Sequence, residues 1–187
     1  MSYNPQGMFN WAVTWCNMPN VGYSQAYRNF RTVDGITYFD CSSFTFFACW
    51  LGGNLDIGAM GYSTTLDDYR EGRANAWTVS SMINALTNYG WDRIPITDAV
   101  LQPCDIIATT SSHCEIYYGD SPIQMMGARN SSLPLDDQVA VHQTTLNYIR
   151  SYYDWVLRPN GGQPPGPTPT PTRRKGIPLW MLLRYTP

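Results

Sequence analysis

A short apolar segment that follows an aspartate constrains the fold of this chain more than any other feature. Residues 41–51, CSSFTFFACWL, are mostly apolar; Asp40 stands directly before them and two glycines follow. Asp is a preferred N-cap residue and Gly a preferred helix stop, so the segment predicts a helix that begins at Cys41. A helix that is apolar on all sides is stable inside a protein. We therefore expect a buried helix with Cys41 in its first turn.

Helical patterns come before strand-like patterns along the chain. Residues 5–17 and about 80–89 carry apolar side chains at helical spacing, and the polar residues 22–35 predict a loop. Short apolar or alternating segments typical of strands follow at residues 105–108, 113–118, 123–126, 139–142 and 153–157. This order predicts an α+β fold, in which N-terminal helices pack on an antiparallel sheet.

Length and composition indicate how the chain is divided. Its 187 residues fit one core, which we place at residues 1–159. Residues 160–172 are rich in Pro, Gly and Thr and predict an extended linker, and residues 173–187 form a short basic, then apolar tail. The tail is suited to docking on the domain or binding a partner protein, ahead of association with an anionic wall or membrane.

Charge and hydropathy exclude several classes of function. The net charge is only -2, which gives no basic field for capturing nucleic acid. No run of about 18 apolar residues predicts a membrane span. The N-terminus has no positive end followed by an apolar stretch, so we expect synthesis in a cytoplasm without a secretory signal.

The cysteines have no spacing typical of a metal site. There are five, at positions 16, 41, 49, 104 and 114, without a C-x-x-C pair. A zinc site needs four suitably spaced ligands, so we expect no metal. An odd number of cysteines in a protein of cytoplasmic origin favours reduced thiols, most of them packed as small apolar side chains.

One cysteine and one histidine have the positions that nucleophilic chemistry requires. The positive end of a helix and a nearby imidazole both lower a thiol pKa, and Cys41 is expected at such an end. His113 begins a predicted strand, from which it can face the helix. Cys114 should point to the opposite side of the sheet from His113. A lone buried cysteine more often serves packing, and His142 stays open as a base or a surface residue.

Four segments resemble one family of enzymes. Residues 38–44, YFDCSSF, resemble the D-C-S-[GS]-F nucleophile motif of NlpC-type cell-wall peptidases and related phage amidases, and residues 112–119, SHCEIYYG, resemble their histidine motif. Residues 102–107, QPCDII, resemble their strand that enters the sheet, and residues 22–25, GYSQ, with Arg28, are similar to a segment before the cysteine in phage amidases. The resemblance covers about residues 5–158 and implies a papain-like fold closest to the phage endolysin amidase branch.

The resemblance assigns roles to individual residues. Cys41 would be the nucleophile and His113 the base. Tyr23 would lie near the scissile carbonyl and help to hold the oxyanion, together with the backbone N–H of Cys41; a packed aromatic role for Tyr23 stays open. Asp40 and Ser42 would belong to the substrate-binding or oxyanion side of the site.

The chain departs from the family pattern at two informative positions. A third polar residue normally orients the histidine from the following strand, and the nearest register here gives Met125. Gln124 or Asn130 is expected to serve instead, and we favour Gln124. Family members usually have Gly before the Asp of the sheet-entry motif, where this chain has Cys104.

The function that the resemblance implies is hydrolysis of peptidoglycan by a phage or prophage enzyme. It would cleave an amide bond within the stem peptide, or between that peptide and muramic acid, through a Cys–His acyl-enzyme and without a cofactor. It would act on the cell wall after release at lysis or from a virion, with peptidoglycan as partner and a wall or phage-tail protein as a candidate partner for residues 173–187. Alternatives are a phage-tail structural or wall-binding module of the same fold without catalysis, and a cysteine peptidase or transglutaminase-like enzyme acting on proteins.

Overall fold

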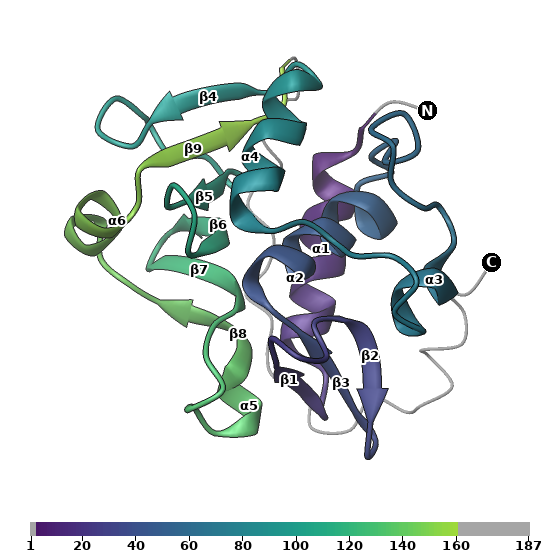
Figure 1. Cartoon of the computed structure of the whole chain (residues 1–187). Coiled ribbons are helices and arrows are strands. Elements are labelled where there is room, and N and C mark those ends of the chain that lie inside the picture. The colour runs from purple at the N-terminus through teal and green to yellow at the C-terminus, as the bar shows by residue number, and fades with distance from the viewer. Residues whose placement is uncertain (1–2, 161–187) are drawn as a thin grey trace.

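The computed structural model describes residues 3–160, and the tail predicted at 173–187 and most of the predicted linker lie outside them. In chain order the elements are α1 (Pro5–Cys16), β1 (Val21–Tyr23), β2 (Asn29–Val33), β3 (Ile36–Phe39), α2 (Cys41–Phe47), the π-helix η1 (Ala48–Gly52), α3 (Leu66–Arg70), α4 (Val79–Asn88), β4 (Asp92–Pro95), β5 (Ile106–Ala108), β6 (Cys114–Asp120), β7 (Ile123–Ala128), α5 (Leu135–Gln138), β8 (Val139–Gln143), α6 (Leu146–Tyr152) and β9 (Trp155–Arg158). Helices of the first half lie against strands of the second half (Figure 1). The predicted α+β class is confirmed.

The larger sheet of the described residues has six strands in the order β4-β9-β5-β6-β7-β8. Every neighbouring pair in it is antiparallel. Asp105, directly before β5, is bound to Arg158 of the neighbouring strand β9. The Arg158 guanidinium donates two hydrogen bonds of 2.7 Å to the Asp105 carboxylate. A paired guanidinium and carboxylate of this geometry is a strong, directional contact. The sheet is therefore fixed at the strand that leads toward His113.

Both faces of this sheet are covered. On one face α1, α2 and α4 pack against side chains such as Ile106, Ile116 and Met126. On the other face a smaller apolar cluster includes Ile107, Tyr117, Met125 and Val156, with Ile149 of α6. Alternate residues of each strand thus belong to different cores, which is the period of a strand covered on both sides.

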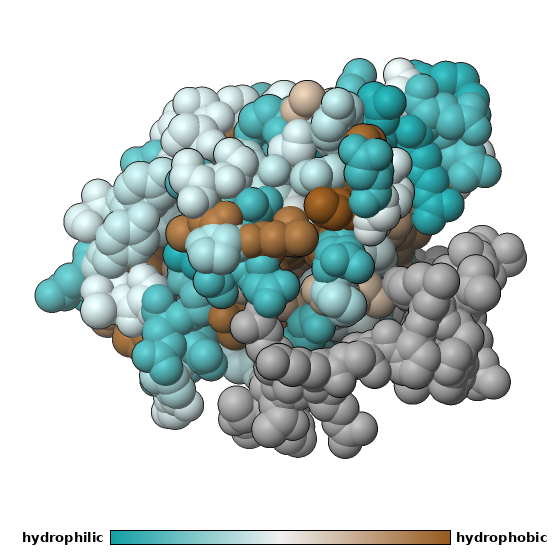
Figure 2. Space-filling model, turned by 90° about the horizontal axis from the view of Figure 1, so that it is seen from below, coloured by the Kyte–Doolittle hydropathy of each residue, from teal (hydrophilic) through white to brown (hydrophobic). Residues whose placement is uncertain are grey.

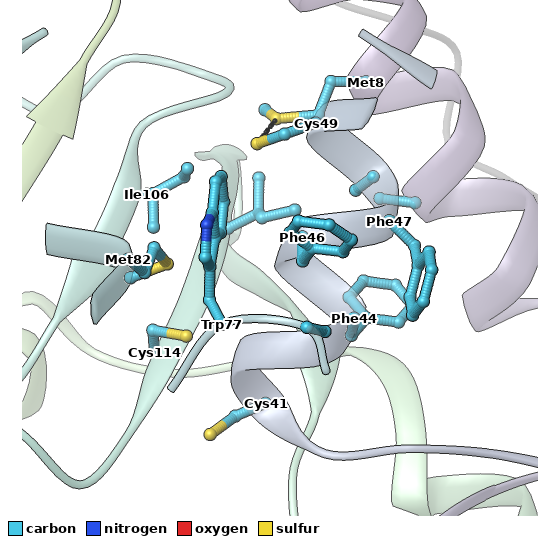
Figure 3. Close-up of a cluster of buried hydrophobic side chains, with 14 of the residues drawn as sticks. Met8, Cys41, Phe44, Phe46, Phe47, Cys49, Trp77, Met82, Ile106 and Cys114 are labelled. Carbon is cyan, nitrogen blue, oxygen red and sulfur yellow. Dashed lines mark hydrogen bonds between the residues drawn. The ribbon is translucent and has the colours of Figure 1, made fainter. Parts of the chain in front are cut away.

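The helix α2 lies wholly inside the protein, as its apolar sequence predicts. All seven of its residues are buried. Phe46 meets Trp77 edge-on at 5.0 Å between ring centroids, and Figure 3 shows Phe44, Phe46 and Phe47 reaching into one cluster with Trp77. Aromatic pairs of this geometry stabilise a fold by about 0.5–1.5 kcal/mol each, beyond the contribution of the apolar area that they bury. The helix that begins at Cys41 is therefore a rigid support.

The predicted helix changes form in its second half. Residues 41–51 were expected to make one helix, but the α-helical turns end at Phe47 and η1 continues to Gly52. This wider turn meets α1 at close range. A Cβ atom on Gly52 would lie 2.5 Å from the Cβ of Trp11, and one on Gly7 would lie 2.2 Å from the carbonyl oxygen of Gly52. Contacts under 3.0 Å do not occur between real atoms of this kind, so both positions require glycine.

The loop predicted for residues 22–35 is wrong. β2 lies within it and pairs antiparallel with β3, while β1 pairs parallel with β3. The sequence of β2 is polar in part, so its pairing to β3, rather than an apolar pattern of its own, stabilises it. This small sheet matters for the site because its register places Tyr23 beside Phe39, two residues before Cys41.

The face of the described residues that is lowest in Figure 1 has an ordinary distribution of polar and apolar groups. Figure 2 views the end that is lowest in Figure 1, where hydrophilic and intermediate residues cover most of the surface and a few apolar side chains lie near its middle. Scattered apolar side chains are usual on protein surfaces. Among residues 3–160, no helix has the length and apolar character needed to cross a bilayer.

Candidate active site

The first turn of α2 is fixed by a reciprocal pair of hydrogen bonds. β3 ends at Phe39 and Asp40 caps the helix: its Oδ1 accepts the backbone N–H of Ser43 at 2.7 Å, and the Ser43 hydroxyl accepts the backbone N–H of Asp40 at 2.9 Å. This capping box satisfies two backbone donors at the helix start. Cys41 therefore stands at the positive end of a helix dipole, where an anionic sulfur is stabilised.

A buried polar network supports the cap from behind. Arg28 Nε lies 2.8 Å from Asp40 Oδ2, and the same guanidinium donates to the Ser42 hydroxyl at 3.0 Å and to the Trp77 carbonyl. Ser42 Oγ also donates to that carbonyl, at 2.7 Å. Burial raises the pKa of Asp40 and Arg28 opposes the rise. The resemblance implies a place for Asp40 and Ser42 on the substrate side, whereas in the structure their polar atoms bind other groups of the fold and hold the helix start.

The segment before β6 brings His113 to the start of α2. The Thr109 hydroxyl accepts the backbone N–H groups of both Ser112 and His113 at 2.9 Å. The Ser112 carbonyl is 4.0 Å from the Cys41 sulfur. Cys114 turns to the helix side of the sheet, as strand alternation predicts, and its sulfur is 3.6 Å from the Thr45 hydroxyl. Figure 3 shows the side chains of Cys41 and Cys114 on the same side of the aromatic cluster.

The environment makes Cys41 an acidic thiol. A hydrogen bond from Cys114 is the largest influence; together with the hydrogen bond and positive charge of His113 it outweighs burial and lowers the pKa of Cys41 to about 4. Burial raises the pKa of Cys114 well above its usual value, so Cys114 stays a neutral donor. Burial disfavours a charged His113, yet its contacts with Cys41 and Glu115 raise its pKa to about 10. At neutral pH the pair is therefore a thiolate and an imidazolium.

Glu115 is the carboxylate next to His113. It follows two residues later in the sequence and is only 3% exposed. Its Oε2 lies 3.9 Å from His113 Nε2 and accepts the Tyr153 hydroxyl at 2.8 Å, while Oε1 lies 2.8 Å from His142 Nε2. Burial alone would raise the pKa of this carboxyl, but His113 and His142 hold it well below its usual range. The arrangement of thiolate, imidazole and carboxylate is one that supports nucleophilic catalysis.

Comparison with protein-family models and with curated proteins finds no match for this sequence.

Room for Glu115 is provided by the neighbouring strand. Gly127 on β7 faces it, and a Cβ atom there would lie 3.3 Å from Glu115 Cγ. His142 on β8 then reaches the carboxylate from beyond β7. Side chains from β8, from the segment before β6 and from the segment after α6 therefore meet at one buried carboxylate.

The two residues considered for orienting the histidine have different positions. Gln124 pairs with Gly119, at the opposite end of β6 from His113, so it does not contact the imidazole. Asn130 lines a pocket together with His113, and its side-chain oxygen accepts the backbone N–H of Ser132 at 2.8 Å. The carboxylate that does contact His113 is Glu115.

Tyr23 lies close to the candidate nucleophile. The parallel pairing of β1 with β3 places it beside Phe39, and the Gln138 side chain accepts its backbone N–H at 2.8 Å. Burial raises the pKa of its hydroxyl, and the nearby negative charges of Cys41 and Asp40 raise it further. The hydroxyl, which accepts a hydrogen bond from the Gln25 amide at 2.5 Å, is therefore neutral and able to donate a hydrogen bond.

Sequence reasoning missed Glu115, and a signal for it was present. Residues i and i+2 of a strand share a face, so a glutamate two positions after the candidate base is a natural partner for it. The expectation that the orienting residue comes from the following strand favoured Gln124.

Among residues 3–160, no three His, Cys, Asp or Glu side chains are grouped so as to hold a metal ion.

Proposed function

We propose that this chain is a papain-like cysteine hydrolase that cleaves an amide bond of peptidoglycan, within the stem peptide or between that peptide and muramic acid. The observation that carries the proposal is the acidic thiol of Cys41 at a helix start, next to an imidazole that contacts a buried carboxylate. The choice of peptidoglycan rests on the resemblance of residues 38–44 and 112–119 to the motifs of wall-degrading enzymes. That resemblance also supports a phage or prophage origin.

The reaction would proceed by acyl transfer. The Cys41 thiolate attacks the amide carbonyl carbon and forms a tetrahedral oxyanion, to which the Cys41 backbone N–H and the Tyr23 hydroxyl donate hydrogen bonds. Imidazolium His113 gives its proton to the leaving amine as the C–N bond breaks and a thioester forms. Neutral His113 then takes a proton from water, whose oxygen attacks the thioester and releases the acid and the thiolate. Glu115 holds the imidazole in place and stabilises its charged form.

The deciding experiment compares products released from purified bacterial walls. Wild type, Cys41→Ala and the matched control Cys16→Ala are incubated with walls, and soluble fragments are identified by mass spectrometry. Wild type and the control should release the same fragments with new amino and carboxyl ends, and Cys41→Ala should release none. The identity of the ends tells which amide bond is cut. Full release by Cys41→Ala would refute the mechanism.

A second candidate is a wall-binding or phage-tail module of the same fold without catalysis. The burial of Cys41, which is 3% exposed, favours it because a nucleophile must reach its substrate. Pull-down of the protein with insoluble walls, without release of fragments by wild type, would support this candidate. Cleavage of casein but not of walls would instead indicate a peptidase acting on proteins.

A further inference from the structure

A pocket of about 460 Å³ lies beside the candidate base, on the face of the sheet opposite α2. His113, Glu115 and His142 contribute to it from the sheet, Arg129 and Asn130 from the segment after β7, and α6 contributes tyrosines. Its volume is in the range of sites that hold small molecules or one part of a larger ligand. Because His113 belongs both to the pocket and to the candidate catalytic pair, a ligand in the pocket would touch the group that moves the proton.

The acceptor atoms at the base of the pocket are already occupied. His142 engages one oxygen of Glu115, and Tyr153 and His113 engage the other. Both oxygens of Glu115 therefore already have partners within the protein, and the carboxylate has little capacity to bind a cationic ligand.

Arg129 provides a cation without a counter-ion. Within residues 3–160, the guanidinium groups of Arg28, Arg70, Arg73 and Arg158 are in ion pairs, and Arg93 stacks on Trp155. The half-buried Arg129 lines the pocket, and its guanidinium has no such partner in this part of the chain. A planar guanidinium fits a carboxylate with two parallel hydrogen bonds.

The remaining walls suit the uncharged part of an acidic peptide. Tyr148 and Tyr152 of α6 stack at 5.4 Å between centroids and are 48% and 43% exposed. Leu133 adds an apolar surface, and Thr144 adds a hydroxyl. Flat aromatic and aliphatic surfaces next to a guanidinium accommodate a short alkyl segment that ends in a carboxylate.

We propose that this pocket is a subsite for a carboxylate of the peptide substrate, with Arg129 as its anchor. This inference rests on the proposed function, because it places the substrate across His113. It adds a chemical preference: the bond that is cut lies near a free carboxylate of the peptide, and conversion of that group to an amide weakens the interaction.

The test uses two synthetic stem-type peptides that differ only in one group, a free carboxylate in the first and a carboxamide in the second. Values of kcat/KM are measured for the wild type, Arg129→Gln and the control Arg150→Gln, an exposed α6 arginine outside the pocket lining. Wild type and control should prefer the acid by about tenfold or more, since only the acid can form a charge-assisted pair with Arg129. Arg129→Gln should lose this preference and cleave the amide as well as the wild type does. An equal preference in all three proteins would overturn the inference.

Failure of the proposed function gives a different pattern. If the wild type cleaves neither peptide, binding of both to Cys41→Ala is measured by calorimetry, with and without Arg129→Gln. Tighter binding of the acid that disappears with Arg129→Gln supports the carboxylate subsite even without hydrolysis. Equal binding of acid and amide overturns it. If N-acetylglucosamine displaces the acid peptide equally well from Cys41→Ala and from the variant that also carries Arg129→Gln, the pocket binds a sugar. That result would also overturn the carboxylate subsite.

Discussion

At the scale of single residues, the site depends on charges that stabilise one another in a buried place. The thiolate of Cys41, the imidazolium of His113 and the carboxylate of Glu115 would each be unfavourable alone in an apolar surrounding. In contact, each makes its neighbour's charged form more stable.

The reactivity of Cys41 should persist in acid. With a pKa of about 4 its thiolate is populated at about pH 5, whereas an ordinary thiol with a pKa near 8.5 loses reactivity about tenfold for each pH unit below that value. Iodoacetamide should therefore modify Cys41 at about pH 5, as measured by peptide mass spectrometry. Cys49, whose pKa burial raises to about 12, is the internal control and should stay unmodified. A tenfold fall in the Cys41 rate per pH unit below about pH 8 would contradict the assignment.

Glu115→Gln should narrow the pH range of the thiolate–imidazolium pair. The folded pKa of His113 is raised to about 10, above its usual 6.5, so the charged imidazole is lost as pH rises through about 10. Removing the carboxylate charge should lower that pKa by about one to three units and shift the alkaline limit of hydrolysis by the same amount. NMR titration of His113 and the pH profile of activity measure the change. Glu71→Gln, at an exposed surface ion pair, should leave both unchanged.

Cys104 should carry measurable backbone strain. Its φ is 76°, in the left-handed region that favours glycine. The thiol is buried and donates to the Pro5 carbonyl at 3.1 Å, so its removal has a separate effect. Cys104→Ala loses the thiol and keeps the strain, and Cys104→Gly loses both. The glycine variant should therefore be more stable than the alanine variant by about 1 kcal/mol in urea denaturation. Equal stability of the two would argue against strain.

The candidate pair at the site could be predicted from sequence, because its two signals are local. A cap before an apolar segment marks Cys41, and a strand pattern marks the start of β6 next to His113. Glu115 was equally visible two residues later, but its role depends on His142 and Tyr153, which reach it from distant parts of the chain. Contacts between residues this far apart in the chain cannot be read from local sequence patterns.

At the scale of elements, the contact between α1 and η1 determines how the buried helix is held. The backbones approach so closely at Gly7 and Gly52 that a single methyl group would overlap with the neighbouring chain. The helices α1 and α4 and the central strands were predictable, because each has a clear apolar period. The strand β2 and the π-helical turn were not, since the first depends on pairing with β3 and the second breaks the regular helical period.

Gly52→Ala should destabilise the protein by about 1–3 kcal/mol, because its new Cβ would lie 2.5 Å from the Trp11 Cβ and 2.8 Å from the Gly7 carbonyl oxygen. The midpoint of thermal unfolding measures the loss. Gly61→Ala is the comparison: it has nothing within 4 Å and a φ of +83°, so it should lose only about 1 kcal/mol through backbone strain. An unchanged midpoint for Gly52→Ala would mean that α1 and η1 can separate at little cost.

At the scale of the whole molecule, residues 3–160 contain the paired strands and both apolar clusters described above. The site lies where the helices of the first half meet the sheet of the second half, and the pocket lies on the far side of that sheet. A cooperative unit of this size is expected to unfold in one transition.

A chain that ends after residue 160 should therefore fold and keep the acidic thiol. Its thermal midpoint should lie within about 2 °C of the full-length value, because the apolar surface buried in the two clusters is unchanged. Calorimetry measures the midpoint, and alkylation of Cys41 at about pH 5 tests the site. A broad transition without a heat-capacity peak would show that the remaining residues are needed for folding. Wall binding by the two forms, compared in parallel, tests the role predicted for residues 173–187.

The thiol and its imidazole belong to different halves of the chain, and neither half has the unusual acidity alone. We expect the cysteine to be an ordinary, slowly reacting thiol during synthesis and to gain its low pKa only when β6 packs against α2. The ionisation state of Cys41 therefore indicates whether β6 is packed against α2. In any partly open form in which these two elements separate, Cys41 should lose its reactivity in acid before the rest of the structure unfolds.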